Sequence, residues 1–380
     1  MASVPPHGPI GWRNWKAALA NQPAAGTLEY ALYTDAGVTG QITTGPYFWI
    51  NTIAGTFTPI VGKAELAIVL RADIHLTDEE FAPLQIDWDK RNTKDYIAGD
   101  LDDEIAQLGS LALGCRLRSG GLTRRFDVDD DHGMPFEGWH RRPRLTPPEP
   151  GGRAILPDVE VSVNLSHAAE LLEIYPALGL NDARALARAS RLYAQALWVA
   201  DDDPAQAWLR LVSALEAAAN QWKAPAKQSP IERLQLADPE LADLIAKAPT
   251  DVADALAEKL APTAKAIAKF LEFTLEHLPD PPAKRPEFGQ VDWADMSKAL
   301  QMIYSHRSLD LHAGIPFPGP LCAIPMTDDH SVATEKIHSF GVAGQGAVWT
   351  EDDLPMHLHT FAYIAGGAIR RWWAQMAARA

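Results

Sequence analysis

The sequence predicts an α+β domain over residues 1–145, followed by an all-α helical bundle over residues 159–380. Three observations support this fold class. Before about residue 145, short aromatic and β-branched runs are typical of strands. After about residue 159, alanine-rich stretches carry apolar residues at helical spacing. Between them, residues 146–158 are rich in proline and glycine, which indicates an inter-domain linker.

The linker is predicted from its helix and strand breakers. From Arg141 to Pro157 the chain contains five prolines and the pair Gly151-Gly152. Such a segment cannot sustain a helix or a central strand. The chain has 380 residues, of which 47% are hydrophobic, so each flanking part has enough apolar material for its own core.

The α+β domain is predicted to contain a hairpin, a buried strand and a helix. Tyr47–Ile53 and Thr56–Val61 are strand-like runs separated by Ala-Gly, and Lys63–Ile74 is a longer strand. Asp102–Cys115 has acidic residues in its first turn and apolar residues at helical spacing, with Gly120-Gly121 closing the helix. A role in sensing a signal or selecting a substrate is the expectation for this domain.

The bundle is predicted to contain seven helices joined by short breaks of proline, aspartate and glycine. Asn181 is the expected N-cap of the second helix, and Asp203-Pro204 supplies a cap and a first-turn proline to the third. Thr350, with Asp353 three residues later, predicts a capping box before the last helix. The expected helices are Ser166–Leu178, Asn181–Ala200, Asp203–Trp222, Ile231–Lys247, Val252–His277, Trp293–Ala313 and Asp352–Ala378.

Composition limits the classes of function. The formal net charge of −15 argues against sequence-blind coating of nucleic acid, although a local basic cleft is still compatible with an RNA substrate. Cys115 and Cys322 are far apart and lack metal-ligand spacing, which favours a reducing compartment. No signal-peptide pattern and no apolar run of the roughly 18–20 residues needed to span a membrane is present. We therefore expect a cytoplasmic protein with no membrane segment, no metal and no cofactor.

One motif carries a specific resemblance. The predicted helix Trp293–Ala313 ends in Ile-Tyr-Ser-His-Arg-Ser-Leu-Asp-Leu-His-Ala-Gly, with the arginine at Arg307 and the last histidine at His312. An arginine, four residues and a histidine near the end of the penultimate long helix resemble the Arg-x(4–6)-His signature of the HEPN family. The pattern Tyr-x-x-Arg-Ser-x-x-x-His-x-Gly also resembles the ApeA-like HEPN branch.

Two further segments are similar to the same branch. Asp203–Glu216 contains the Leu-Val-x-Ala-Leu-Glu core of its central helix, and Arg188–Leu197 reads Arg-x-x-Arg-Leu-Tyr-x-x-Ala-Leu. Together the matches cover about residues 160–375. Leu111–Arg125 resembles the companion domain of some members only weakly.

The resemblance implies metal-independent RNA cleavage through the neighbouring 2′-hydroxyl, by a homodimer. It also implies a role in bacterial antiphage defence, such as abortive infection, or in a toxin–antitoxin system with an antitoxin or regulatory partner. His312 would move a proton, because an imidazole titrates near neutral pH. Arg307 would bind the phosphate through paired donors and stabilise its negative charge.

Helix geometry shows why a dimer belongs to this hypothesis. Five residues at ~100° each place Arg307 and His312 about 140° apart, so they do not share a helix face. Gly314 can end the helix in the left-handed conformation, which puts His312 in the last turn, where the helix dipole favours a protonated imidazole. Two such helices paired about a symmetry axis would bring both residue types into one cleft.

Four residues are candidates for supporting this pair. Ser308 follows the motif arginine, where active members often carry Asn, Asp or His. His306 and Asp310 are four residues apart and could form a pair on one helix face. Glu216 could orient Arg307 across the bundle, or form a purely structural salt bridge with it.

Arg184, Arg188 and Arg191 recur at helical spacing. Such a stripe could guide an RNA backbone, but it is more often a solvated face paired with acids, and the abundant Asp and Glu favour that interpretation.

A rival interpretation is a non-catalytic HEPN-fold module for dimerisation or partner binding. An arginine and a histidine near a helix end are commonly surface residues or caps, and the acidic net charge and Ser308 agree with that interpretation. Two other patterns are set aside as metal sites. Asp127–Gly133 departs from a calcium loop and is expected to be a solvated acidic turn. His357 and His359 are expected on opposite faces of a helix, one buried and one exposed.

Overall fold

The computed structural model describes residues 7–52, 62–77, 80, 96–136, 138–148, 154–157, 159, 162–224, 228–338, 341–344 and 346–377. The chain divides into two compact units. Unit 1 comprises residues 1–154, 158–202 and 372–380, and unit 2 comprises residues 155–157 and 203–371. Among the described residues, no helix has both the length and the apolar character to cross a membrane.

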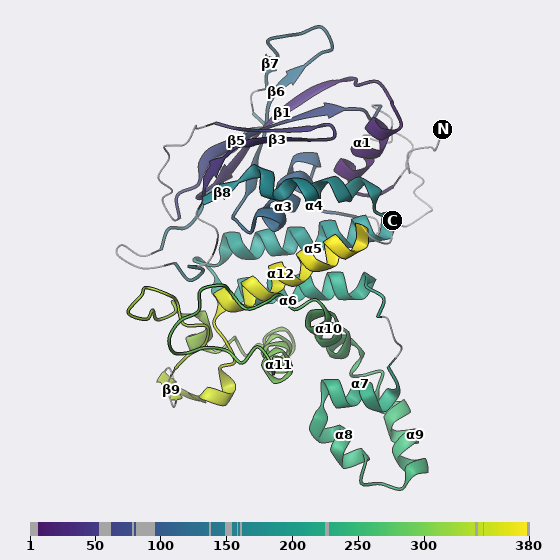
Figure 1. The fold of residues 1–380 in the computed structure, drawn as a ribbon, viewed down its shortest axis with the longest axis vertical. Helices are drawn as coiled ribbons and strands as arrows, with labels where there is room; N and C mark the ends of the chain where they lie inside the picture. Colours follow the sequence, from purple (N-terminus) through teal and green to yellow (C-terminus); the bar gives the residue numbers. More distant parts are fainter. Residues whose placement is uncertain are drawn as a thin grey trace. The chain divides into compact units, whose positions relative to one another are not determined.

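Unit 1 is built on an antiparallel sheet whose described strands run in the order β3-β4-β5-β1-β6-β7 (Figure 1). The long central strands pair from Gly26 opposite Ile74 to Thr34 opposite Glu65. The strands are β1 (Gly26–Thr34), β3 (Gln41–Thr44), β4 (Tyr47–Asn51), β5 (Glu65–Ile74), β6 (Arg118–Phe126) and β7 (Met134–Pro135).

Helices α1 (Ile10–Leu19) and α3 (Leu101–Leu113) pack against each other and supply side chains to the sheet core. The Trp15 ring meets the Tyr47 ring edge-on at 5.4 Å. A Cβ atom on Gly109 would lie 2.6 Å from Trp49, so only glycine allows α3 to approach the sheet this closely. α3 ends at Gly114, whose φ of 69° is left-handed.

The chain returns to unit 1 after the proline-rich segment. Strand β8 (Ser162–Asn164) pairs in parallel with β2 (Gly37–Thr39), and the helix that follows later, α5, packs on α3. Residues 158–202 therefore belong with the sheet, and the compact units do not follow the predicted linker at 146–158. The elements of this return are η1 (Leu165–Ala168), α4 (Ala169–Ile174), η2 (Tyr175–Ala177) and α5 (Leu180–Val199).

A buried ion cluster joins the turn between α3 and β6 to the chain just after α5. The Arg116 side chain, 2% exposed, donates to Asp35 at 2.8 Å and to Asp201 at 2.7 Å. Its Nε atom donates to the Leu197 carbonyl at 2.8 Å. Two carboxylates and a carbonyl thus compensate the burial of one guanidinium.

A buried carboxylate caps helix α1 from the side. Glu104 accepts hydrogen bonds from the backbone N–H groups of Gly11 and Trp12 at 3.0 and 2.9 Å. It also accepts from the Tyr175 hydroxyl at 2.8 Å. Burial raises the pKa of Glu104 to about 7 and outweighs these hydrogen bonds, which lower it.

Unit 2 is helical around an aromatic stack. Trp208 lies between the rings of Phe317 and Phe361, at 5.5 and 5.0 Å, and donates from Nε1 to the Leu321 carbonyl at 3.1 Å. The helices are α6 (Pro204–Gln221), α10 (Lys265–Glu276), α11 (Ser297–Ala313) and α12 (Leu358–Ala377), the last extending beyond unit 2.

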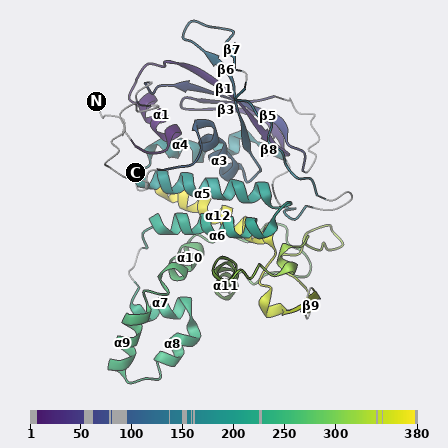
Figure 2. The ribbon, with the colours of Figure 1, turned by 180° about the vertical axis from the view of Figure 1, so that it is seen from behind.

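Three short helices of unit 2 form a separate group (Figure 2). They are α7 (Pro230–Ala237), α8 (Pro239–Ile245) and α9 (Thr250–Leu260). The group has its own apolar cluster, whose buried members are Leu234, Ala242, Ile245, Ala257, Ala261 and Ala264.

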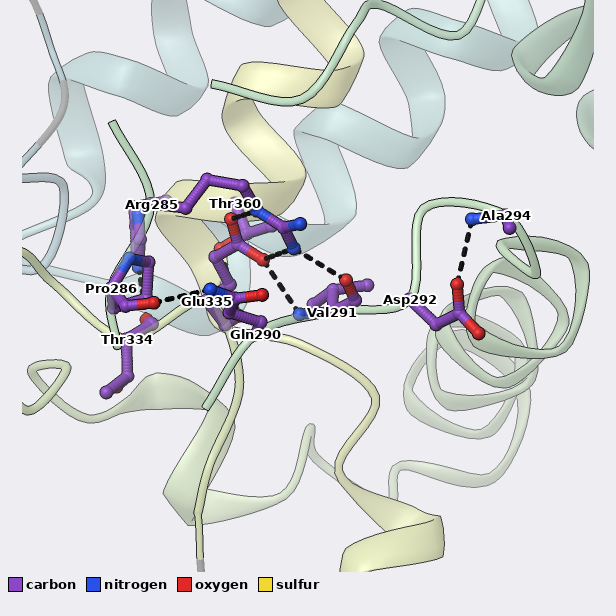
Figure 3. Close-up of polar contacts among 10 residues, drawn as sticks. Arg285, Pro286, Gln290, Val291, Asp292, Ala294, Thr334, Glu335 and Thr360 are labelled. Carbon is purple, nitrogen blue, oxygen red and sulfur yellow. Dashed lines mark hydrogen bonds and ion pairs between the residues drawn. The ribbon is translucent and has the colours of Figure 1, made fainter. Parts of the chain in front are cut away.

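The chain between α11 and α12 carries little regular structure. It contains η3 (Gly319–Cys322), the hairpin of β9 (Gly341–Gly344) with β10 (Ala347–Thr350), and the turn η4 (Glu351–Asp353). Glu335, in its middle, is 3% exposed and accepts two hydrogen bonds from Arg285, at 2.7 and 2.5 Å, and one from the Val291 N–H at 2.7 Å (Figure 3). This bidentate pair ties the segment to the loop before α11.

The predicted order of an α+β region followed by a helical region is confirmed. Strands β4 and β5, helix α3, and α6 with its Asp203 cap and Pro204 are found where the sequence placed them. Thr56–Val61 lies outside the described residues, so its hairpin with Tyr47–Ile53 stays a prediction.

Several local predictions were wrong. Gly120-Gly121 lies inside β6, and Gly114 ends α3 instead. Gly179, not Asn181, precedes α5. Each proline within a predicted helix interrupts it, because proline lacks the N–H that a helix interior needs. The interrupting prolines are Pro176 in Ser166–Leu178, Pro239 in Ile231–Lys247, Pro262 in Val252–His277 and Pro355 in Asp352–Ala378.

Candidate functional site

All the buried residues of helix α11 lie in its first half. Its buried residues are Leu300, Ile303 and Tyr304, and no residue from Ser305 to Ala313 is buried. The helix ends at Gly314, whose φ of 65° is left-handed, as the sequence predicted. The C-terminal half of α11 is therefore a rigid element with accessible side chains.

Arg307 is held against α6 by Glu216. Its Nη2 donates to Glu216 Oε2 at 2.6 Å, and the two side chains are 17% and 19% exposed. The Tyr304 hydroxyl donates to Glu216 Oε1 at 2.9 Å, and the Arg307 guanidinium carbon lies 5.3 Å from the Tyr304 ring centre. One carboxylate thus orients the guanidinium and the phenol together, in the position that the sequence suggested for Glu216.

Glu216 engages only part of the Arg307 guanidinium. Its Nε is buried and has no hydrogen-bond partner among the described residues, and Glu216 takes one N–H of Nη2. A guanidinium has five N–H donors. Glu216 therefore leaves most of the five donors uncommitted while it fixes the orientation of the side chain.

Tyr304 is fixed as a hydrogen-bond donor. Burial, followed by the charge of Glu216, raises the pKa of Tyr304 to about 12. The phenol therefore stays protonated at neutral pH and keeps donating to Glu216. The sequence analysis gave Tyr304 no role. Its position three residues before Arg307, on the same helix face, could have indicated that the two side chains lie together.

His312 lies in the last turn of α11 and is exposed. Leu309, Leu311 and Ile315 around it are 43%, 51% and 52% exposed. Within one copy of the described chain, no hydrogen bond or ion pair joins His312 to Arg307, because the two point in different directions from the helix. The two motif residues share an element but not a cleft in the single chain.

The supporting pair predicted between His306 and Asp310 is wrong. His306 Nε2 lies 3.0 Å from the Asp353 carbonyl, and its ring is 6.1 Å from Phe317. Burial lowers the pKa of His306, so the neutral ring donates from Nε2 to that carbonyl. His306 fastens α11 to the η4 turn, and Ser308 next to the motif arginine is partly exposed.

Arg184, Arg188 and Arg191 do not form an exposed basic stripe. All three lie on α5 and are partly buried, and Arg188 donates to the Tyr96 carbonyl at 3.4 Å. They belong to unit 1, whereas Arg307 belongs to unit 2. Their partial burial argues against a fully open basic stripe, and a role in guiding RNA stays a prediction.

His357 and His359 were predicted to be one buried and one exposed, and both are buried, at 4% and 3% exposure. His357 precedes the helix, so helical spacing does not apply to the pair. His359 Nε2 lies 2.8 Å from the Thr334 carbonyl, so this nitrogen is already engaged in a hydrogen bond. Within the described ranges, no group of three or more His, Cys, Asp or Glu side chains is arranged to hold a metal ion.

The two cysteines are shielded. Cys115 is 1% exposed. Burial, with Asp203 and Asp310 nearby, raises the pKa of Cys322 to about 12, so almost no thiolate forms at neutral pH. Neither thiol has the character of a catalytic nucleophile.

Comparison with known proteins finds no match to a protein family model, to a curated protein or to a solved structure.

Proposed function

We propose that the chain is a HEPN-type endoribonuclease that acts as a homodimer and cleaves RNA through the neighbouring 2′-hydroxyl without a metal ion. The observation that carries the proposal is the contact set of Arg307, Glu216 and Tyr304. It holds a guanidinium with spare donors on the same helix as an exposed histidine, His312. These residues are the ones that the motif resemblance singles out.

Arg307 is suited to bind the scissile phosphate. Its unused N–H donors can make paired hydrogen bonds to two phosphate oxygens. In the transition state the phosphorus centre gains negative charge, which a fixed guanidinium stabilises without having to reorganise. Glu216 contributes by fixing the orientation of Arg307, so it is a positioning residue.

His312 is suited to move protons. The 2′-oxygen attacks phosphorus while its proton passes to a base, the bond to the 5′-oxygen breaks, and that oxygen takes up a proton. An exposed imidazole at a helix C-terminus can take part in either transfer. In a symmetric dimer one copy of His312 would serve each transfer.

Homodimer formation has support in the apolar side chains around His312. Leu309 and Leu311 on the last turns of α11, and Ile315 just after the helix, are each more than two-fifths exposed. Apolar groups clustered on one element are typical of an interaction surface. A self-complementary contact about a two-fold axis would bury them and bring two His312 side chains together.

A second candidate function is a non-catalytic dimerisation or partner-binding module of the same fold. The observation that favours it is again the salt bridge of Arg307 with Glu216, which is only partly exposed and could serve stability alone. The two functions predict opposite results in a cleavage assay.

The test is cleavage of a labelled single-stranded RNA by the purified full chain in the presence of excess EDTA. We expect products with a cyclic phosphate and a 5′-hydroxyl, and a loss of about 100-fold or more in rate for Arg307→Ala or His312→Ala. His330→Ala removes a different exposed histidine of unit 2 and is the matched control, expected to leave the rate unchanged.

Two results would contradict the ribonuclease. One is cleavage that continues in both motif variants, which would point to a contaminating nuclease. The other is a wild-type chain that dimerises and leaves all RNA intact, which would favour the binding module. Sequencing of cellular RNA ends after expression of the wild type and of His312→Ala would then identify the RNA that is cut.

A further inference from the structure

Unit 2 contains an apolar cavity that the proposed function does not use. Its volume is about 560 Å³, and it lies between η3, the chain that follows it, and the β9–β10 hairpin. This volume is within the range of about 300–1,000 Å³ that is typical of small-molecule sites. The side chains that matter most are Ile324, Met326, Ile337, Val342, Trp349 and His357.

His357 supplies the polar group of this cavity. Its side chain is 4% exposed, and its Nε2 lies 3.3 Å from the Thr334 hydroxyl. Its other ring nitrogen, Nδ1, is buried and has no hydrogen-bond partner among the described residues. Buried polar atoms are rarely left unpaired, because the lost hydration is then not recovered.

The neighbouring contacts favour the tautomer of His357 that carries its proton on Nε2. The Thr334 hydroxyl donates to the Met326 carbonyl at 3.3 Å, so its oxygen accepts the hydrogen from His357 Nε2. Burial, followed by the presence of His359, lowers the pKa of His357 to about 3, so the ring is neutral. A neutral ring that is protonated on Nε2 has a lone pair on Nδ1, and the unpaired atom is therefore an acceptor.

The polar side of the cavity is rigid. The backbone N–H of His357 donates to the Glu335 carbonyl at 2.8 Å, and the Thr360 hydroxyl donates to the same carbonyl at 2.9 Å. The Glu335 carboxylate is in turn held by Arg285, as Figure 3 shows together with Thr334 and Thr360. A preformed polar group in an apolar cavity loses little freedom when a ligand binds.

We propose that this cavity binds an uncharged, largely apolar aromatic molecule that directs one hydroxyl or N–H donor to His357 Nδ1. The described lining residues include no Asp, Glu, Lys or Arg, and His338, the other histidine among them, is exposed, so a charged ligand would lose its hydration without gaining a buried ion-pair partner. The Trp349 indole and the aliphatic side chains offer a flat apolar surface to a ring. The site is independent of the RNA-cleavage proposal.

The test uses indole and benzofuran, which have nearly the same shape and differ in the N–H donor. Binding to the full chain is measured by isothermal titration calorimetry. We expect saturable binding of indole with one site per chain, and at least about tenfold weaker binding of benzofuran, because only indole can satisfy Nδ1. In His357→Leu the preference for indole disappears.

A cavity-filling variant keeps the test valid if His357→Leu does not fold. Ile324 is 45% exposed at the rim, so Ile324→Trp blocks the cavity with little strain on the core and is expected to abolish indole binding. Val348→Trp on strand β10 is the matched control, because Val348 is 75% exposed and does not line the cavity. It is expected to bind indole as the wild type does.

The proposal fails if indole shows no saturable binding up to its solubility limit. It also fails if benzofuran binds as tightly as indole, or if a folded Ile324→Trp variant retains wild-type affinity. The ¹⁵N resonances of His357 give an independent check. They are expected to show a neutral ring protonated on Nε2, and a shift of the Nδ1 resonance when indole is added.

Discussion

Single buried acids control how unit 1 responds to pH. Glu104 has a pKa raised to about 7 by burial, and Asp102, which accepts a short hydrogen bond from Ser119, has a pKa raised to about 6 by burial. Their ordinary values are 4.5 and 3.8. Because both pKa values are raised, the folded state binds protons more tightly than the unfolded chain does.

The sign of the pH dependence follows. The raised pKa values of Glu104 and Asp102 stabilise the folded state fully below about pH 4, where both acids are neutral. This stabilisation is lost as pH rises through about 6 to 7, because both acids then become buried negative charges. From these two shifts we expect the free energy of unfolding of unit 1, followed by amide hydrogen exchange in its sheet, to fall by about 5 kcal/mol between pH 4.5 and pH 8. The lowered pKa values of His306 and His357 act in the opposite direction in unit 2.

Glu104→Gln should make this decline smaller, because glutamine does not ionise. The variant should also be less stable at every pH, because its amide NH₂ group, itself a donor, would face the Gly11 N–H. Glu173→Gln, at an exposed position of α4, is the control and should keep the wild-type slope. Stability that rises over this range would contradict the burial argument.

The residue scale also shows what the sequence could reveal about the site. Glu216 was found because the motif match placed it opposite Arg307, and the distance of 2.6 Å agrees with that placement. The partner of His306 could not be found, because Asp353 is 47 residues away and contributes its backbone carbonyl, which every residue has. Side-chain chemistry leaves a pattern in a sequence, whereas a contact to the backbone does not.

At the scale of elements, local signals were predictive and long-range pairing was not. Asp203 and Gly314 act at helix ends as expected, because capping depends on neighbouring residues. Thr350 forms the predicted capping box with Asp353, but the box caps the η4 turn and not the last helix, which begins at Leu358. Strand β1 was missed because Tyr30 to Thr34 are all buried, which removes the alternation that identifies a strand. The parallel pairing of β2 with β8 joins segments more than 120 residues apart, and no local sequence pattern predicts such a pairing.

Asp238 provides a test of a cap at the element scale. Its backbone N–H ends α7 by donating to the Leu234 carbonyl at 2.7 Å, and its carboxylate starts α8 by accepting from the Leu241 N–H at 3.0 Å. We expect Asp238→Ala to destabilise α8 by about 1 kcal/mol, seen as faster amide hydrogen exchange in Leu241 and its neighbours.

The control is Asp243→Ala, which removes an exposed acid from the middle of α8. It should leave exchange near the wild-type rate. Equal effects of the two substitutions would show that general electrostatics, and not the cap, stabilises this helix.

At the scale of the whole molecule, the two units have separate cores and separate buried ion pairs. Arg116 with Asp35 and Asp201 belongs to unit 1, and Arg285 with Glu335 belongs to unit 2. The proline-rich segment was a poor guide to this division, because composition records where the backbone is irregular and not which elements pack together.

The proposed homodimer is a property at this scale. We expect the wild type to sediment as a dimer, and the double variant Leu309→Asp, Leu311→Asp to sediment as a monomer, because two charges would have to be buried in the contact. Both side chains are exposed in the single chain, so the circular dichroism spectrum should not change.

Val252→Asp on α9 is the control, since Val252 is 44% exposed on a different helix and should not affect association. A wild-type chain that sediments as a monomer at high concentration would exclude the proposed pairing of α11 helices.

The shielding of Cys115 and Cys322 has a practical consequence for studying that pairing. A maleimide reagent needs an accessible thiolate, and the native chain offers hardly any at neutral pH. A cysteine introduced on the exposed end of α11 would therefore take up a spin label or a fluorophore selectively, with no need to remove the native thiols. Distances between two labelled copies would then trace how the helices meet in solution.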